Sequence, residues 1–561
     1  MSESPAHQLV VEVDPAHVSV YGTRADSLRR ALGSAVVTLT LGVLGSTILP
    51  VPYAFSKLGI APGAATMAIV AFANDRTCCM LVRASAATGR CGYEALAEWA
   101  GGRRARVLTQ VSLILLLYGT MCGGLAFLSD VARIMVLKGL PASDQPPPPA
   151  TGGGAVAGAS WWQGWLELAR RDGRPVMLLV VACVLYPLCL QRYIRQFERA
   201  ATVGVVVVIT LMTLVIAKAV LAGFPAVASG ELPVWGLKKG AHEMLPEAFA
   251  VLGFAFYMQP MLMPLLAEMP GGPAGVAVSE KAVHTVLYGV ACAAYGTVGI
   301  FGASLFGDAT ESNIMVNELL PGHPWYTLLL YGALMGYLCC GMVTTQFALR
   351  ASIEVLLFGD DKPPFTWTRQ VAETTCILIA SLAIACSFPT AAEKIFAVTG
   401  CTAVCLVCYC IPVYIHLVLR SRLAWAVRGG PAVELPYSDS AVQVGQKHTT
   451  PDSSTNYLQL PPTGEEEFSG PHDGHSGAGV TAASNGGLQE PLLHAHDDRR
   501  SRASQLAVQR LLHAKPGQVG CWQWCCDMAL PLFIVAVGVG CSLAGLWVAA
   551  VDIARGLNSG S

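Results

Sequence analysis

The chain has 561 residues, of which 53% are hydrophobic and only 13% are charged. A soluble domain carries about 25% charged residues, so this composition excludes an ordinary soluble protein and predicts a membrane protein. The formal net charge of -1 provides no basic field, which excludes a protein that binds nucleic acid by charge.

Eleven membrane helices are predicted, because a helix that crosses the hydrocarbon core needs about 20 mostly apolar residues. A tail, residues 1–32, precedes them; ten helices form a core over 33–420; the eleventh lies in 528–554, and a short tail, 555–561, follows. In chain order the predicted helices are Gly33–Ser56, Ile60–Val82, Val107–Val136, Val176–Leu190, Ala201–Leu221, Met244–Leu266, Ala282–Phe306, Trp325–Leu349, Val371–Phe388, Ile395–Leu419 and Met528–Val551.

Two long segments between these helices are polar. The stretch Pro141–Ser160 contains QPPPPATGGG and is predicted to be a flexible outer loop. Residues 421–527 are rich in Gly, Ser, Asp and His and are predicted to be a disordered cytosolic insert. Most of the 19 cysteines lie inside apolar runs, where a thiol behaves as a small hydrophobic group. We therefore expect neither a metal centre nor a cofactor.

Basic residues in the loops predict the orientation, because cytosolic loops carry an excess of Lys and Arg. The tail before the first helix and the loops after the second and fourth helices are all basic, and a cytosolic N-terminus places them on one side. The loop after the third helix disagrees, since it should be external and yet contains Arg170, Arg171 and Arg174. We expect a cytosolic N-terminus, in a vacuolar or lysosomal membrane or in the plasma membrane.

The first helix carries signs of an interruption. In the sequence LTLGVLGSTILPVPYAF, Gly42 and Gly45 weaken the helix, and Pro50 and Pro52 each lack an amide donor. Backbone groups remain unpaired in a membrane only where they line a cavity or bind something. The segment is therefore a candidate binding site.

The sixth helix repeats this pattern, since Gly253 is followed by Pro260 and Pro264. Two interrupted helices that lie five apart are typical of a five-plus-five inverted repeat. In carriers of that kind, half-helix N-termini face an anionic group of the substrate, and the freed carbonyls hold cations or an ammonium group. The alternative is that both helices contain ordinary membrane Gly and Pro, whose neighbours pair the backbone.

Several motifs resemble one family. The stretch Gly45–Phe55 is similar to the pattern G-x-G-I-L-x-L-P-Y-A-F, and Gly307 to Ile314 match an outer-loop signature, F-G-D-x-x-x-S-N-I. Further likeness lies at Gly92–Ala97 with Tyr118–Met121, at Tyr186–Leu190, and at Phe254–Phe256 with Gln259, Pro260, Pro264 and Glu268. Over Ala31 to Leu419 the chain resembles the amino acid/auxin permease family, and within it the neutral amino acid transporters of the sodium-coupled type.

This resemblance implies an all-α polytopic membrane protein with a LeuT-like five-plus-five inverted repeat plus an eleventh helix. It also implies that backbone amides around Gly45, Ser46 and Thr47 meet the carboxylate of an amino acid. Carbonyls around Phe254, Ala255 and Phe256 would then meet its ammonium group. Side chains expected to shape the pocket offer no acid for a cationic substrate, which favours small or neutral amino acids; they are Tyr118, Thr120, Tyr257, Thr344 and Thr345.

Two departures from the family concern sodium. Where sodium-coupled relatives have an Asn and a Thr as ligands, this chain aligns Leu41 and Gly341, which have no side-chain oxygen. Hard cations need oxygen ligands, so proton coupling or exchange is favoured over sodium coupling. Thr344 and Thr345 lie nearby, and either would supply a hydroxyl ligand in place of Gly341 if the two sequences align in another register.

Proton coupling requires a titratable group in the pathway. The candidates are Asp75 in the second helix, Asp130 in the third, His284 in the seventh, and Glu268 at the end of the sixth. Arg76 follows Asp75 directly, which leaves a structural role open for this carboxylate. Glu268 belongs to a family-like motif and is the first of the four to mutate.

The sequence thus predicts a secondary transporter, a symporter or exchanger, with partners limited to an amino acid, a coupling proton and the bilayer. Neither a nucleotide-binding loop nor a motif of a catalytic nucleophile or zinc protease is present, so we do not expect an enzyme. One alternative remains open: a transporter-like amino acid sensor that signals through its cytosolic insert.

Overall fold

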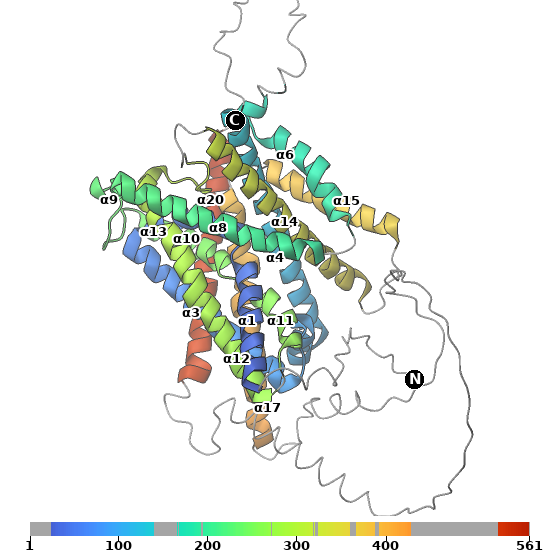
Figure 1. The fold of residues 1–561 in the computed structure, drawn as a ribbon. Helices are drawn as coiled ribbons and strands as arrows, with labels where there is room; N and C mark the ends of the chain where they lie inside the picture. Colours follow the sequence, from blue (N-terminus) through green and yellow to red (C-terminus); the bar gives the residue numbers. More distant parts are fainter. Residues whose placement is uncertain are drawn as a thin grey trace, which may run out of the picture. The chain divides into compact units, whose positions relative to one another are not determined.

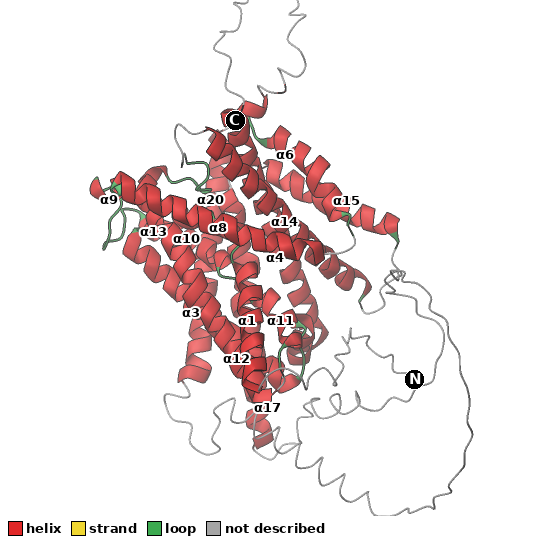
Figure 2. Ribbon diagram, viewed as in Figure 1, coloured by secondary structure: helices red, strands yellow, loops and turns green. Residues whose placement is uncertain are grey.

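The computed structural model describes residues 24–139, 165, 168–191, 195–270, 272–317, 319, 324–359, 366–387, 392–427 and 525–559. Within these ranges every regular element is a helix, and none is a strand (Figure 2). The predicted outer loop Pro141–Ser160 and residues 428–524 of the predicted insert lie outside the described residues.

The helices of the described part follow the order of the predicted spans (Figure 1). Nine helices are long and apolar enough to cross a membrane, Arg174–Cys189 is a shorter apolar helix, and the α1–α2 pair precedes them all. The spans are α1 (Arg24–Val43), η2 (Ser46–Ile48) and α2 (Val51–Leu58); α3 (Ile60–Thr88); α4 (Tyr93–Gly139); α6 (Arg174–Val180), η3 (Val181–Leu185) and α7 (Tyr186–Cys189); α8 (Arg195–Ala222); α10 (Ala241–Ala255) and α11 (Gln259–Glu268); α12 (Gly272–His284), η4 (Thr285–Ala291) and α13 (Cys292–Phe306); α14 (Pro324–Phe358); α15 (Trp367–Ser387); α16 (Ala392–Thr399), η6 (Gly400–Cys410) and α17 (Ile411–Val427); η9 (Cys525–Ala529) and α20 (Leu530–Ser559).

The first span is interrupted where its glycines and prolines predict. Helix α1 ends at Val43, and the amide of Gly45 turns back to donate to the carbonyl of Val43 at 2.8 Å. A single 3-10 turn follows, and α2 then begins with proline in its first turn, where the missing amide costs no hydrogen bond. The span is therefore two half-helices joined by irregular backbone.

The sixth span is interrupted too, but not at Gly253. This glycine lies buried inside α10, which continues to Ala255. The irregular residues are Phe256 to Met258, and α11 resumes with Pro260 in its first turn. Pro260 suits the first turn of α11, where its missing amide costs no hydrogen bond, whereas Pro264 lies inside the same helix. The expected all-α fold class is confirmed, and its two interrupted spans lie five apart, as a LeuT-like five-plus-five arrangement requires.

Two elements begin earlier than the sequence predicts. Within α4, a short helix from Tyr93 to Ala100 precedes the third span, because Gly101 and Gly102 are not helical and Gly102 has a positive φ of 69°; the span itself begins at Arg103. Helix α1 starts at Arg24. The basic residues near both starts lower the hydropathy, so a hydropathy profile assigns them to loops. Arg is nevertheless a good helix former, and the helices include these residues.

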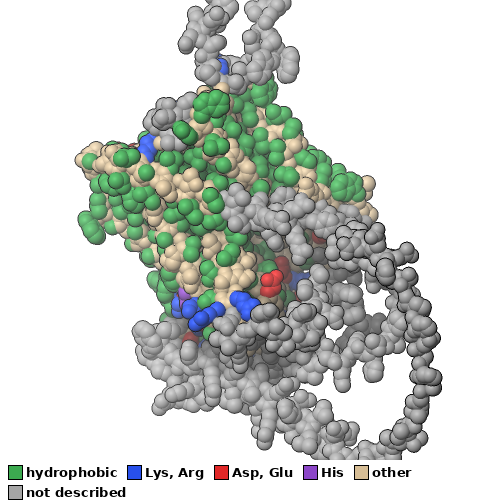
Figure 3. All heavy atoms as spheres, in the orientation of Figure 1, with side chains coloured by type: hydrophobic (Ala, Val, Ile, Leu, Met, Phe, Trp, Pro, Cys, Tyr) green, Lys and Arg blue, Asp and Glu red, His purple; other side chains and the backbone are tan. Residues whose placement is uncertain are grey.

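Close packing around Phe55 joins α2 to two other helices. A Cβ added at Gly63 in α3 would lie 2.9 Å from the ring, and one added at Gly299 in α13 would lie 2.6 Å from it. The outer surface, in contrast, exposes large apolar side chains such as Leu221, Trp325 and Trp547. The visible face is largely hydrophobic (Figure 3), which suits helices that contact lipid.

Candidate functional site

The two interruptions meet at the hydroxyl group of Tyr295. This side chain is fully buried in α13, and its single hydroxyl proton is shared between the carbonyl of Val43 at 2.6 Å and that of Ala255 at 3.0 Å. The hydroxyl of Thr47 lies 3.0 Å from the same oxygen. The last residues of α1 and α10 are therefore tied to one side chain of a third helix.

A second tyrosine pairs the next freed carbonyl of the first span. The hydroxyl of Tyr337 in α14 donates to the carbonyl of Leu44 at 2.6 Å. Its ring lies against Gly204 in α8, where an added Cβ would be only 2.1 Å from Cε2 of the ring. An unpaired backbone group in the membrane interior costs several kcal/mol, so both tyrosines stabilise the broken backbone.

Gln259 stabilises the second interruption from its own side chain. Its Oε1 accepts from the amide of Met258 at 3.0 Å and from the Cys408 thiol at 2.9 Å. Its Nε2 donates to Asn74 Oδ1 at 3.0 Å and to Thr77 Oγ1 at 3.1 Å. All four hydrogen bonds are buried, and they connect the start of α11 to α3 and η6.

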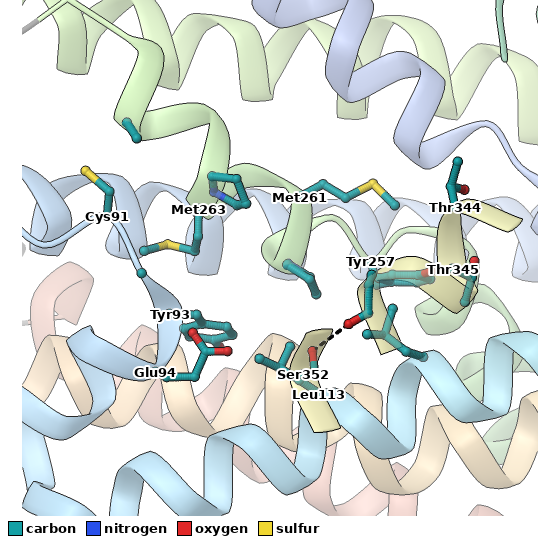
Figure 4. Close-up of a pocket in the computed structure, with 16 residues that line it drawn as sticks. Cys91, Tyr93, Glu94, Leu113, Tyr257, Met261, Met263, Thr344, Thr345 and Ser352 are labelled. Atoms are coloured by element: carbon teal, nitrogen blue, oxygen red, sulfur yellow. Dashed lines mark hydrogen bonds between the residues drawn. The ribbon is translucent and has the colours of Figure 1, made fainter. Parts of the chain in front are cut away.

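A cavity of about 550 Å³ lies beside the interrupted sixth span, within the size range of ~300–1,000 Å³ that is usual for small-molecule sites. In Figure 4, Tyr257, Thr344 and Thr345 lie at one end, and Cys91, Tyr93 and Glu94 at the other. The other lining residues are mainly apolar; they are Gly92, Leu113, Leu117, Pro260, Met261, Met263, Pro264, Ala267, Ala348 and Ser352.

Two of the four coupling candidates are in contact. The buried Oδ1 of Asp75 in α3 contacts Nδ1 of His284 in α12, and Oδ2 accepts from Arg76 Nη2 at 2.6 Å. Asp75 has no exposed surface, whereas 41% of the His284 side chain is exposed. The Cys79 thiol lies close enough to Asp75 and His284 for the three side chains to hold a metal ion. The guanidinium group of Arg76, however, already balances the charge of the Asp75 carboxylate.

The other two coupling candidates lie elsewhere. Glu268 is exposed at the end of α11, and Asp130 is half-buried in α4. Thr344 and Thr345 line the cavity, and their hydroxyls donate to the carbonyl of Gly341 at 2.8 and 3.0 Å. These threonines thus pair within their own helix.

The residues predicted to bind substrate lie mainly at the two interruptions. Gly45 and Thr47 belong to the break in the first span, and Phe254 to Tyr257 lie at or beside that in the sixth. Ser46 lies in η2, and its side chain is outside the described part. Tyr118 is half-buried in α4 and is not among the residues that line the cavity.

Sequence reasoning missed Tyr295, Tyr337, Gln259 and Asn74 as parts of this site. A weak signal existed, because each is a polar side chain in an otherwise apolar span, where polar groups tend to pair with one another or with carbonyls. The sequence does not reveal the partner, since Tyr295 is 252 residues from Val43. That contact is set by the packing of distant helices.

These features define a class: an α-helical membrane protein with two interrupted spans that meet at a buried polar site. The model of the family described as "Transmembrane amino acid transporter protein" matches residues 30–429. The chain belongs to this family, and the resemblance to the amino acid/auxin permeases is confirmed.

Several relatives are amino acid transporters by name. The chain is 23% identical to the amino acid transporter AVT6E of Arabidopsis thaliana over 73% of this chain and 81% of that protein. It is 22% identical to solute carrier family 38 member 10 of Rattus norvegicus over 68% of this chain, but only 32% of that one. A Xenopus laevis protein with sodium-coupled neutral amino acid transporter 10 in its name is 22% identical over 69% of this chain and 34% of its own length. The chain thus spans about a third of these two animal relatives.

Among solved structures, a mutant of the manganese transporter of Eremococcus coleocola aligns over 95% of this chain and 98% of its own. The identity is 11% and the TM-score 0.38. A likeness of this size carries no argument about the present site.

Proposed function

We propose that the protein is a secondary carrier of small or neutral amino acids that works by alternating access and is coupled to protons rather than sodium. The observation that carries the proposal is the pair of interrupted spans with their irregular backbone side by side at Tyr295. Such backbone persists in a membrane where it lines a cavity, binds a ligand or is paired by neighbouring side chains, and secondary carriers use paired interruptions of this kind to bind substrate. Membership of an amino acid transporter family supports the same class of substrate.

The substrate would bind where the half-helices end. The positive N-terminal dipole ends of α2 and α11 suit its carboxylate, and the carbonyl end of α10 around Phe254 and Phe256 suits its ammonium group. The neighbouring cavity would lead from Tyr257 to the Cys91–Glu94 connection, on the cytosolic side in the predicted orientation. Apart from Glu94 at the far end, apolar groups and uncharged polar groups line it, so small or neutral side chains fit it best.

The Asp75–His284 pair is the proposed coupling site. The carboxylate is buried and the imidazole that it contacts is 41% exposed, so the ring is the route by which a proton would reach the pair. The groups around the pair are Arg76 and Cys79 of α3, Tyr288 of η4, and the Arg83–Glu280 ion pair at 2.6 Å.

Sodium coupling is less well supported by this chain. Leu41 and Gly341 lack the side-chain oxygens of the sodium-coupled pattern, and the hydroxyls of Thr344 and Thr345 both donate to Gly341. The name of the Xenopus relative refers to sodium coupling instead. The identity of the coupling ion is therefore the first property to measure.

Uptake of labelled neutral amino acids into sealed liposomes that contain the purified protein tests the proposal. We expect an inward pH gradient to drive accumulation and an inward sodium gradient to have no effect. Accumulation driven by sodium alone would contradict proton coupling. If neither gradient drives uptake of any common amino acid, the carrier function is wrong and an amino acid sensor becomes the better hypothesis.

An Asp75→Asn variant tests the coupling site separately. We expect it to lose accumulation driven by the pH gradient but to keep exchange of labelled for unlabelled substrate, because exchange needs no net proton movement. Glu247→Gln is the matched control, since Glu247 is a buried carboxylate of α10, outside the proposed pair. Loss of coupling in the control alone would show that the site is wrong, and loss of exchange in Asp75→Asn would show that Asp75 is structural.

A further inference from the structure

The carbonyl groups at the ends of α1 and α10 have the chemistry of a cation site. The C-terminal end of a helix carries a negative partial charge, and carbonyls freed at broken membrane helices coordinate cations in secondary transporters. In this chain the carbonyls of Val43, Leu44 and Ala255 stand at these ends, and each one accepts a hydrogen bond from a tyrosine.

Tyr295 occupies the point on which the oxygens of both interruptions converge. The carbonyls of Val43 and Ala255 and the hydroxyl of Thr47 lie 2.6, 3.0 and 3.0 Å from its hydroxyl oxygen. Three oxygens from two spans thus surround one oxygen of a third. Oxygens are the ligands that hard cations take, and here a neutral hydroxyl occupies the point that these three oxygens share.

Tyr337 occupies a comparable position between the first and eighth spans. It belongs to α14, the helix of Gly341, and its hydroxyl reaches Leu44, three residues after Leu41. The place of its ring is built into the fold, because any side chain larger than glycine at position 204 would overlap it. The tyrosine therefore lies close to the two positions at which the sodium-ligand side chains are missing.

We propose that the hydroxyls of Tyr295 and Tyr337 replace bound cations at the two interruptions. Each of the two tyrosines is a positioning residue: it gives the half-helix ends a permanent, neutral hydrogen-bond donor in place of an exchangeable ion. The inference rests on the proposed sodium-independent carrier and explains how its broken helices stay together without a metal ion. It follows that removal of one tyrosine ring creates a place for a cation.

Thermal unfolding of the purified full-length protein tests this inference without any transport. The melting temperature is measured in sodium chloride and in choline chloride of equal ionic strength. We expect the wild type to melt at the same temperature in both salts, Tyr337→Phe to melt lower in both, and Tyr337→Ser to melt low in choline but to recover in sodium. Tyr186→Phe is the matched control, because Tyr186 pairs with Thr375 at 3.0 Å, away from both interruptions.

Sodium-dependent stabilisation of the wild type would overturn the inference, as would a Tyr337→Ser variant that is indifferent to sodium. Gly204→Ala serves as a second variant, since it keeps the hydroxyl but displaces the ring, and it should melt lower in both salts. Where uptake is measured, Tyr295→Phe should reduce the rate at least about tenfold through the lost hydrogen bonds to the carbonyls of Val43 and Ala255, and Tyr186→Phe should not. If the wild type shows no uptake, the proposed carrier function is wrong. The melting temperatures would still test the inference about the two tyrosines.

Discussion

At the scale of single residues, Gln259 shows how one polar side chain stabilises irregular backbone inside a membrane. Its amide makes four buried hydrogen bonds, one of them to the main chain of the interruption itself. Each group would need another partner if the amide were absent, because water does not reach a fully buried site. The side chain thus acts as a local substitute for the missing helical hydrogen bonds.

Gln259→Leu should lower the free energy of unfolding by about 2–3 kcal/mol, because it leaves several buried polar groups unpaired. The melting temperature of the purified variant is the measurement, and Gln191→Leu is the control, since Gln191 is exposed. Equal melting temperatures for the two variants would show that the hydrogen bonds of Gln259 contribute little.

At the scale of elements, glycines allow helices to approach each other closely. Gly123 in α4 faces α16, and an added Cβ would lie 2.3 Å from Cζ of Phe396. That ring also packs on Phe254 beside the sixth interruption, with ring centroids 4.5 Å apart. A change in the spacing of α4 and α16 would therefore move the ring of Phe396 against Phe254 and so alter the proposed substrate site.

Gly123→Ala should destabilise the protein by about 1–3 kcal/mol through overpacking, and it should lower substrate affinity because Phe396 moves against Phe254. Gly336→Ala in α14 is the control, as nothing lies within 4 Å of its added Cβ. Unfolding and substrate binding are measured on both variants. A control that is as damaged as Gly123→Ala would argue against a specific role for this contact.

These elements also show which features the sequence can reveal. The interrupted spans were predicted because proline and glycine act locally, although Gly253 was the wrong marker for the second break. Asp75 and His284 were named separately, and their contact could not be predicted, since it joins helices 209 residues apart. Tyr295 and Tyr337 escaped notice because a tyrosine in an apolar span is ordinary until its partner is known.

At the scale of the whole molecule, the eleventh span is part of the core. An added Cβ at Gly545 in α20 would lie 2.5 Å from the sulfur of Cys401 in η6. Arg420 at the end of the tenth span forms an ion pair with Asp527 at the start of the eleventh. All residues of the proposed site lie in 24–427, and α20 packs directly on that part.

Deletion of residues 434–515 should leave transport within about twofold of the wild type, because the proposed site is complete without them. Truncation after residue 515 should abolish folding, since it removes α20 from the core. Uptake in liposomes and elution as a single species in detergent are the two measurements. Loss of uptake in a well-folded internal deletion would give those residues a direct role.

The thiol of Cys91 lines the cavity at the end away from Tyr257 (Figure 4). A maleimide that cannot cross lipid would reach it from one side of the membrane only, and its rate of reaction would fall whenever that route closes. In the proposed carrier, the alkylation rate of this native cysteine would thus report the conformational cycle, with the maleimide as the only added label.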